Sequence, residues 1–381
     1  MISIGLLLLA TSCRSNSEAQ RVRPRQLRDV PAQRLAFTFT ADVDPPANVN
    51  AEEAKPISAI QQDFDERRKD EAVALVRTVA SPDGQRALAL YSGQDEPSTT
   101  FHIDLYSSDG HYIRNVSPPE LAVVFQDSVV WSSDSAQIAF VGRKAASPQP
   151  SPTPEEIEPA VPLTSPLPSP TTMPAFAAVA TFSTEQIYTC DRDGYDLRPL
   201  TTRDGLIYFA LSWAPDSHAL AALACKESEW NAREKEYKTP AGRPRLVSVD
   251  GQERLLDDEL AQASPIWSPD SSKVATAFGV DIGIYDAAGK APTQARIVLR
   301  ERMLTASAAF DEKSASKKSA NTSNAPATTL PVSFNPIVRI EWPVPEKLYV
   351  QTGYLDLRNL LPTFSRWHLL TLSPQAVVLG R

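Results

Sequence analysis

The sequence predicts an all-β chain, a β-propeller of five visible four-stranded blades, and three observations support this prediction. A strand–turn–strand unit recurs along the 381 residues, a second hairpin follows each unit, and the units keep a regular interval once two low-complexity insertions are set aside. Four antiparallel strands in about 45 residues are typical of one propeller blade. Because the chain shows only five such repeats, a sixth, poorly marked blade stays open.

The clearest copy of the repeated unit spans residues 263–278. One strand ends in Trp267-Ser268, and Pro269-Asp270 begins a tight turn into the next strand. Proline presets φ for the first turn position, and Asp and Ser side chains bond the local backbone. The other copies are residues 213–217, 131–135 and, without the Trp, 80–84.

The two long intervals between successive Trp residues of the repeat each contain an insertion. Residues 145–175 are dense in Pro, Ser and Thr, and residues 306–329 are rich in Ser, Ala, Lys, Asn and Thr. Such segments cannot bury enough apolar surface to order themselves, so both are predicted to be disordered. They lie inside the repeats, because the strand pattern resumes after each of them.

Alternating apolar residues predict the remaining strands, and two polar segments favour helices. A short helix is expected within 57–70 and a helical loop within 226–238. The predicted strands are 72–79, 86–91, 101–106 and 111–116; 123–131, 137–143, 184–190 and 196–201; 207–213, 219–224, 244–249 and 253–256; 263–268, 274–278, 281–285 and 295–299; and 337–342, 347–352, 366–372 and 376–379.

Residues 1–13 are predicted to be a signal peptide. An apolar run too short to span a bilayer leads into Ala10-Thr11-Ser12-Cys13. This ending resembles the bacterial lipobox, which implies lipidation of Cys13 and a membrane anchor. The alternative is an ordinary signal peptide with an incidental Cys.

Three further regions follow the predicted signal peptide. We expect a flexible tether at 14–33, an N-terminal strand and linker at 34–71, and the propeller at 72–380. The strand at 35–41 either closes the ring beside the last blade or belongs to a sixth blade.

The bulk composition bears on partners and bound groups. A formal net charge of −8 argues against a nucleic-acid partner, because phosphate binding needs a clustered basic surface. Cys190 and Cys225 lie in apolar strand-like runs, where they either pair in an oxidising compartment or remain small buried hydrophobes. No Cys-x-x-Cys, His-rich or Gly-rich pattern indicates a metal or a cofactor, so we expect neither.

The repeat has a known counterpart. Trp-Ser-Pro-Asp followed by a short apolar strand, with Ile-Tyr-x-x-Asp-x-x-Gly at 187–194, resembles the WD-type repeat of TolB-like β-propellers over residues 72–380. The resemblance implies that the Trp packs between blades and that the Asp ties the turn, which are structural roles. The matching residues are Trp131, Trp213 and Trp267, and Asp134, Asp216 and Asp270.

Markers of catalysis are weak in the sequence. The Gly-x-Ser-x-Gly elbow of prolyl-oligopeptidase-type hydrolases is absent. The four histidines stand in no pattern that marks a nucleophile or a metal site, and we expect structural or surface roles for them: His102, His111, His218 and His368.

These observations favour a non-catalytic, envelope-anchored lipoprotein. It is expected to be exported to the periplasmic or cell-envelope face as a monomer, held at the membrane through Cys13, and to act as a scaffold that binds an envelope protein or peptide. A periplasmic sensor of a small molecule or glycan is the first alternative. A hydrolase with an unmarked site is the second.

Overall fold

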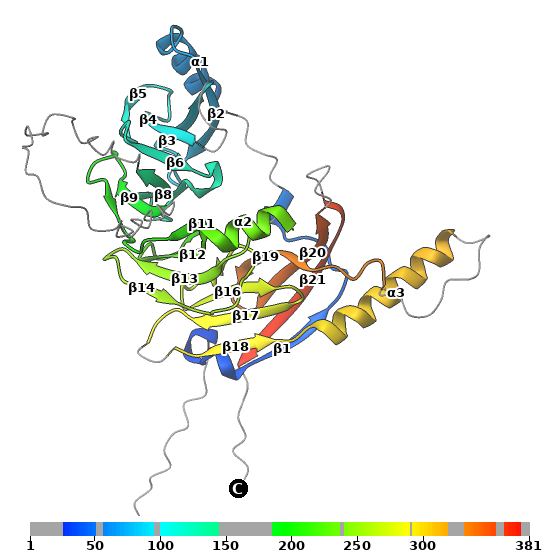
Figure 1. Ribbon diagram of the computed structural model, residues 1–381. Coiled ribbons are helices and arrows are strands. Elements are labelled where there is room, and N and C mark those ends of the chain that lie inside the picture. Colours follow the sequence, from blue (N-terminus) through cyan, green and yellow to red (C-terminus); the bar gives the residue numbers. More distant parts are fainter. Residues whose placement is uncertain are drawn as a thin grey trace, which may run out of the picture.

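The computed structural model describes residues 26–50, 56–94, 100–144, 185–236, 240–289, 292–318, 331–355 and 362–374. Within these ranges the chain is all-β, with several four-stranded antiparallel sheets and few helices, so the predicted fold class is confirmed at that level (Figure 1). None of the helices in the described ranges combines the length and the apolar character needed to cross a membrane. Cys13, the insertion at 145–175 and the strand predicted at 376–379 lie outside the described residues.

Most strands lie in the predicted ranges, but the strand predicted at 123–131 is broken by a 3₁₀ turn at Gln126–Ser128. The strands are β1 (Leu35–Thr40), β2 (Val73–Ala80), β3 (Arg86–Gly93), β4 (Thr100–Ser107), β5 (Tyr112–Asn115), β6 (Leu121–Val124), β7 (Val130–Trp131), β8 (Gln137–Lys144), β9 (Gln186–Asp191), β10 (Arg198–Pro199), β11 (Leu206–Trp213), β12 (Ala219–Lys226), β13 (Arg243–Ser248), β14 (Glu253–Leu255), β15 (Ile266–Trp267), β16 (Lys273–Phe278), β17 (Asp281–Asp286), β18 (Gln294–Ile297), β19 (Ile337–Val344), β20 (Lys347–Leu355) and β21 (Pro362–Pro374). The α-helices are α1 (Ser58–Arg67), α2 (Glu227–Glu236) and α3 (Arg300–Lys318).

The strands pair in chain order within each repeat. Strands β11 to β14 form one sheet and β15 to β18 another, while the first two repeats join through a β4–β6 pair. The last sheet has the order β1-β21-β20-β19. Strand β1 therefore lies along β21, with Leu35 opposite Pro374 and Thr40 opposite Leu369, as the blue and red strands of Figure 1 show.

Antiparallel pairing gives every sheet two different ends. The first and second strands join at one end, here called the turn end, which carries the turns 81–84, 132–135, 214–217 and 268–271. Because neighbouring strands run in opposite directions, the connection from the second strand to the third lies at the opposite end. The connection to the next sheet lies there as well. We call this opposite end the loop end.

Hydrogen bonds join successive turns at the turn end. The backbone N–H groups of Asp83, Asp134 and Asp216 donate to serine hydroxyls of the following turn, at 3.0, 3.1 and 3.0 Å. The accepting serines have positive φ of 61°, 61° and 59°, a region that few residues other than glycine adopt. They are Ser135, Ser217 and Ser271. The inter-turn bond accounts for serine at these positions.

The repeat tryptophans link each sheet to the one before it. The indole N–H groups of Trp131, Trp213 and Trp267 donate to backbone carbonyls on the first strand of the preceding sheet, at 3.0, 3.3 and 3.0 Å. Their rings are buried in apolar layers between sheets. Trp342 differs, because its indole donates to Pro345 O within its own turn.

Two helices confirm the sequence predictions. Helix α1 lies within 57–70 and buries Ile60 and Phe64 against the first sheet. Helix α2 lies within the predicted helical loop at 226–238. Cys190 and Cys225 are both buried and unpaired with each other, so each is a free thiol.

Helix α3 corrects the predicted disorder at 306–329 for residues 306–318. Its stretch is rich in Ala, Glu and Lys, which are strong helix formers. Met303 and Ser307 are buried on one side of the helix, and Arg366 donates to the Ser307 hydroxyl at 2.9 Å. The helix is thus attached to the last sheet by its first half.

The flexible tether predicted at 14–33 is wrong for residues 26–33. Leu27, Val30 and Ala32 are buried. The ammonium of Lys273 donates to Val30 O at 2.7 Å and to Asp286 Oδ1 at 2.6 Å, and Asp286 also accepts the Ala32 N–H. A buried ion pair at the turn end therefore holds the segment that leads into β1.

Candidate site at the loop end

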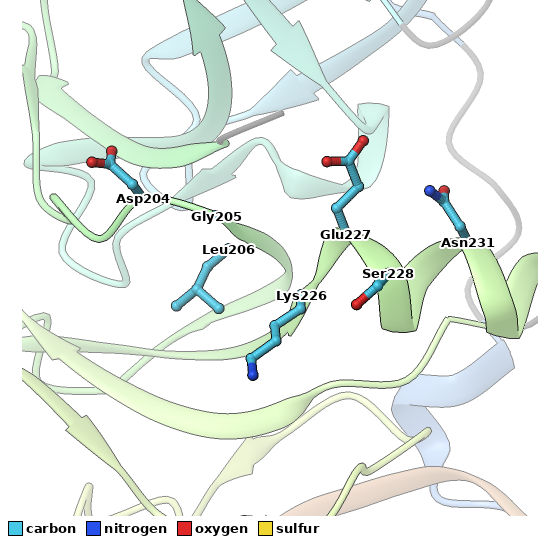
Figure 2. A pocket seen from close by; sticks show the side chains of 7 residues that line it. All are labelled: Asp204, Gly205, Leu206, Lys226, Glu227, Ser228 and Asn231. Atoms are coloured by element: carbon cyan, nitrogen blue, oxygen red, sulfur yellow. The ribbon is translucent and has the colours of Figure 1, made fainter. Parts of the chain in front are cut away.

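A pocket opens at the loop end between the start of β11, the end of β12 and the first turns of α2. Its volume is about 500 Å³. Figure 2 shows Asp204 and Leu206 on one side of the space and the α2 side chains on the other. The lining residues are Asp204, Gly205, Leu206, Lys226, Glu227, Ser228 and Asn231. Such a lining offers charged and neutral hydrogen-bonding groups of both kinds to a small polar ligand.

Local sequence fixes the start of α2 at this pocket. The helix begins directly after β12, and the Glu229 carboxylate accepts the Lys226 N–H at 2.9 Å. A glutamate at this position satisfies one of the unpaired N–H groups at a helix N-terminus, and its charge suits the helix dipole. The guanidinium of Arg243, on β13, donates two hydrogen bonds to the same carboxylate, at 2.8 and 2.9 Å.

Aromatic side chains hold the next turn of α2. The Trp230 ring lies 5.2 Å from the Phe125 ring and 5.3 Å from the Phe209 ring, measured between centroids. Phe125 follows β6 and Phe209 lies on β11, so the helix contacts two successive sheets. The α2 wall of the pocket is therefore fixed on both sides.

Glu185 lies beside this pocket, immediately before β9. Its N–H donates to Leu206 O at 3.2 Å, and Leu206 lines the pocket. The side chain is only 1% exposed. Its Oε1 accepts a hydrogen bond from Arg143 Nη2, whereas its Oε2 is buried without a hydrogen-bond partner. A buried carboxylate oxygen without a donor is rare in folded proteins.

The surroundings of Glu185 favour its protonated form. Burial raises the pKa of the Glu185 carboxyl, Arg143 opposes that rise, and the charge of Glu227 adds to it. The net shift is upward. A carboxyl group with a raised pKa beside a pocket is suited to donate a proton.

The buried thiol of Cys225 is unreactive. Burial raises the pKa of the Cys225 thiol to about 12, so the group stays protonated at neutral pH. Among the described residues, no group of three His, Cys, Asp or Glu side chains could hold a metal ion. The carboxyl groups at this site are suited to acid–base chemistry.

The predicted motif residues lie at the turn end, away from this pocket. The Asp270 carboxylate accepts hydrogen bonds from Ser268 and Ser272 at 2.7 Å each. Burial alone would raise the pKa of Asp270, but these bonds hold it below its ordinary value. Asp134 and Asp216 accept backbone N–H groups two residues ahead in the same way.

The four histidines do not meet at a site. His111 and His218 are exposed at turns, and His102 is half-buried in β4. His368 is buried between Phe39 and Thr352, and burial together with Arg366 lowers its pKa to about 4.

Glu185 and Glu227 are the candidate residues that sequence reasoning missed. Both stand where a regular element begins, at the start of β9 and at the first position of α2. Glu185 carries one available signal, because it is a charged residue placed directly against a buried strand, at the point where the repeat resumes. Its partner Arg143 lies on the far side of the long insertion, so the sequence does not pair them.

Comparisons with known proteins concern the arrangement of sheets. No family model and no curated protein matches the chain. An oligogalacturonate lyase from Vibrio parahaemolyticus is similar over 79% of this chain and 67% of its own, at 10% identity and a TM-score of 0.38. Prolyl oligopeptidase B from Galerina marginata is similar over 92% of this chain and 44% of its own, at 9% identity and a TM-score of 0.46. The chain thus spans less than half of that peptidase.

These similarities correct one expectation. The sequence leads us to expect a non-catalytic scaffold that binds a protein and is not an enzyme, whereas the similar structures include a lyase and peptidases. The non-catalytic interpretation is therefore wrong as the main one. The lyase and peptidase activities belong to those proteins, because a likeness at this identity concerns the fold alone.

Proposed function

We propose that the chain is a hydrolase that acts on a small polar substrate in the loop-end pocket. One observation supports this most strongly: Glu185 is a nearly sealed carboxyl with a raised pKa and an oxygen that lacks a partner. By contrast, the buried carboxylate of Asp104 is hydrogen-bonded at both oxygens, by Arg67, Arg68 and Asn115.

The proposed roles follow from the burial of Glu185 and the place of Glu227 on the pocket wall. Glu185, whose pKa is raised, donates a proton to the leaving group of the scissile bond. Glu227 accepts a proton from the water whose oxygen bonds to the substrate, and exchange with solvent restores both groups. Asp204, Lys226 and Asn231 would orient the substrate through hydrogen bonds.

Turnover tests this proposal. The wild-type protein is assayed on panels of chromogenic aryl glycosides, peptide anilides and aryl esters, and any activity found is measured again in Glu185→Gln. We expect kcat to fall by about 100-fold or more in this variant, because a positioned acid contributes at least that much.

Asp104→Asn is the matched control, since Asp104 is also a buried carboxylate paired with arginine. It should lose stability and keep its turnover per folded molecule. No turnover on any panel, or full activity in Glu185→Gln, would reject the proposal.

A second candidate function, ligand sensing without turnover, is favoured by the pocket lining alone. Charged groups of both signs, a hydroxyl and an amide line the pocket without requiring any reaction. A ligand that raises the melting temperature of wild type and Glu185→Gln equally, with no product formed, would support sensing over hydrolysis.

We also infer that the sheets are the blades of a TolB-like, five-bladed propeller in which β1 completes the last blade. The regular repeat and the β1–β21 pairing support this inference. A cystine placed across Phe37 and Leu372, which lie opposite each other, should form and raise the melting temperature. Failure of the two cysteines to pair would contradict it.

The lipid anchor at Cys13 and the location at the cell envelope remain part of the proposal. The lipobox-like ending of the signal peptide supports them. Mass spectrometry of the mature N-terminus should find acylated Cys13. An unmodified N-terminus at another position would reject the anchor.

A further inference from the structure

Arg143 is hydrogen-bonded to the carboxyl group of Glu185. It stands near the end of β8, and the neighbouring pair Gly142–Gln186 aligns β8 with β9. Its side chain is 44% exposed, whereas that of Glu185 is 1% exposed, and the Arg143 Nη2 atom donates to Glu185 Oε1. The Arg143 side chain thus contacts both the buried carboxyl and solvent.

The backbone next to Arg143 is closely packed. A Cβ atom on Gly142 would come within 2.9 Å of the Leu121 and Tyr188 side chains, which belong to the strands on either side of β8. The packing of β8 between β6 and β9 therefore sets where the Arg143 side chain begins, and the partly exposed side chain reaches Glu185 from there.

The charges around Glu185 oppose one another. From β8, Arg143 favours the ionised carboxyl; from α2, Glu227 disfavours it; and burial disfavours it as well. From β12 the Cys225 thiol stays neutral at physiological pH, and from β11 the Leu206 carbonyl accepts the Glu185 N–H. Arg143 is the cation bonded to the carboxyl, so its contact controls the balance.

We propose that Arg143 is the positioning residue of this site, which fixes the Glu185 carboxyl and decides when that group carries a proton. While the contact holds, Glu185 Oε1 is bonded and the carboxyl is kept closer to its ionised form. When a substrate group with a negative charge draws the guanidinium away, Glu185 takes up a proton and becomes the donor. This inference rests on the proposed function for its purpose, but not for its test.

The test is a titration of the Glu185 carboxyl that needs no substrate. The ¹³C resonance of its carboxyl carbon, assigned by its loss in Glu185→Gln, is followed against pH in the full chain. In Arg143→Gln the midpoint should rise by about one pH unit or more, because an adjacent arginine lowers a carboxyl pKa by that amount. In Arg143→Lys, which keeps the charge, it should return toward the wild-type value.

Two further variants serve as controls for this titration. Arg77→Gln removes an arginine of similar exposure that pairs with Asp127, in the 3₁₀ turn between β6 and β7, and it should leave the midpoint unchanged. Glu227→Gln should lower the midpoint, even if Arg143→Gln fails to fold. An unchanged midpoint in Arg143→Gln or in Glu227→Gln would overturn the inference. If the titration midpoints shift as expected while no substrate panel shows turnover, the proposed hydrolase function is rejected and the role of Arg143 stands.

Discussion

The two ends of the sheets differ in how regularly their connections are built. At the turn end, each turn repeats the previous one, and its serine hydroxyl accepts a backbone N–H of the turn before it. At the loop end, the connections within the described residues differ from one another: helices α2 and α3 are inserted there, and the buried Glu185 Oε2 lacks a partner beside a pocket. The repeated end builds the fold, and the varied end holds the candidate site.

At the turn end, substitution of Trp267 should give the largest loss in the free energy of unfolding. Its ring is 5% exposed between two sheets, and its indole donates to Ser212 O. Trp267→Ala should lower the free energy of unfolding by about 4 kcal/mol, because it leaves a cavity and an unpaired carbonyl. Urea denaturation measures this loss.

Trp230→Ala is the contrasting variant at the loop end. It should release α2 from Phe125 and Phe209 and weaken ligand binding, with a smaller loss of stability. Equal losses in the two variants would contradict the division between the ends.

Much of this division could be predicted from the sequence, for physical reasons. The Trp-Ser-Pro-Asp turn combines a preset φ with short side chains that bond nearby N–H groups, so a local pattern determines a local structure. Helix α1 is also local, because Ile60 and Phe64 fall on one face. The sequence alone leaves two positions open for strand β1, and the β1–β21 pairing places it beside the last sheet.

The rest depends on contacts between distant residues. Residues 26–33 appear polar, yet they are held by Lys273 and Asp286, more than 240 positions away. Arg143 and Glu185 are separated by 42 positions and meet only because β8 pairs with β9. No sequence period reports such a contact, which is why the candidate site could not be predicted from the motifs.

Breaking the Lys273–Asp286 pair should give the next largest loss in the free energy of unfolding. Burial alone would raise the pKa of Asp286, but bonds from Lys273, Thr293 and the Ala32 N–H hold it below its ordinary value of 3.8. The ionised form therefore stabilises the fold at pH values above the unfolded pKa. That stabilisation is lost as the pH falls through the folded pKa.

Asp286→Asn should cost about 3 kcal/mol at neutral pH, because it leaves the Lys273 ammonium buried without its counter-charge. The difference from wild type should shrink below about pH 4. Urea denaturation over a pH series measures both. A difference that grows on acidification would contradict this account.

Substituting a serine with positive φ should change the free energy of unfolding by less. Ser217→Ala keeps the unfavourable φ of 61° and removes the acceptor for the Asp134 N–H, so it should cost about 1 kcal/mol. Ser217→Gly also removes the acceptor but relieves the backbone, and its loss should be smaller. Chemical denaturation of both variants measures the contrast. A glycine variant less stable than the alanine variant would show that φ is not the cost at this position.

Lys226 should give the smallest effect on stability and a clear effect on ligand binding. It is exposed where β12 ends and lines the pocket, and its backbone N–H, not its ammonium, holds the start of α2. Lys226→Ala should therefore change the free energy of unfolding by less than about 0.5 kcal/mol. Because the ammonium is a cation on the pocket wall, its removal should weaken the binding of an anionic or hydroxyl-rich ligand by about tenfold, measured by calorimetry.

Lys347→Ala, at the turn of the last sheet, is the control: it should change stability as little and leave ligand binding unchanged. If the two lysine variants bound ligand equally well, the loop-end pocket would not be the site, and the division between the ends would concern stability alone.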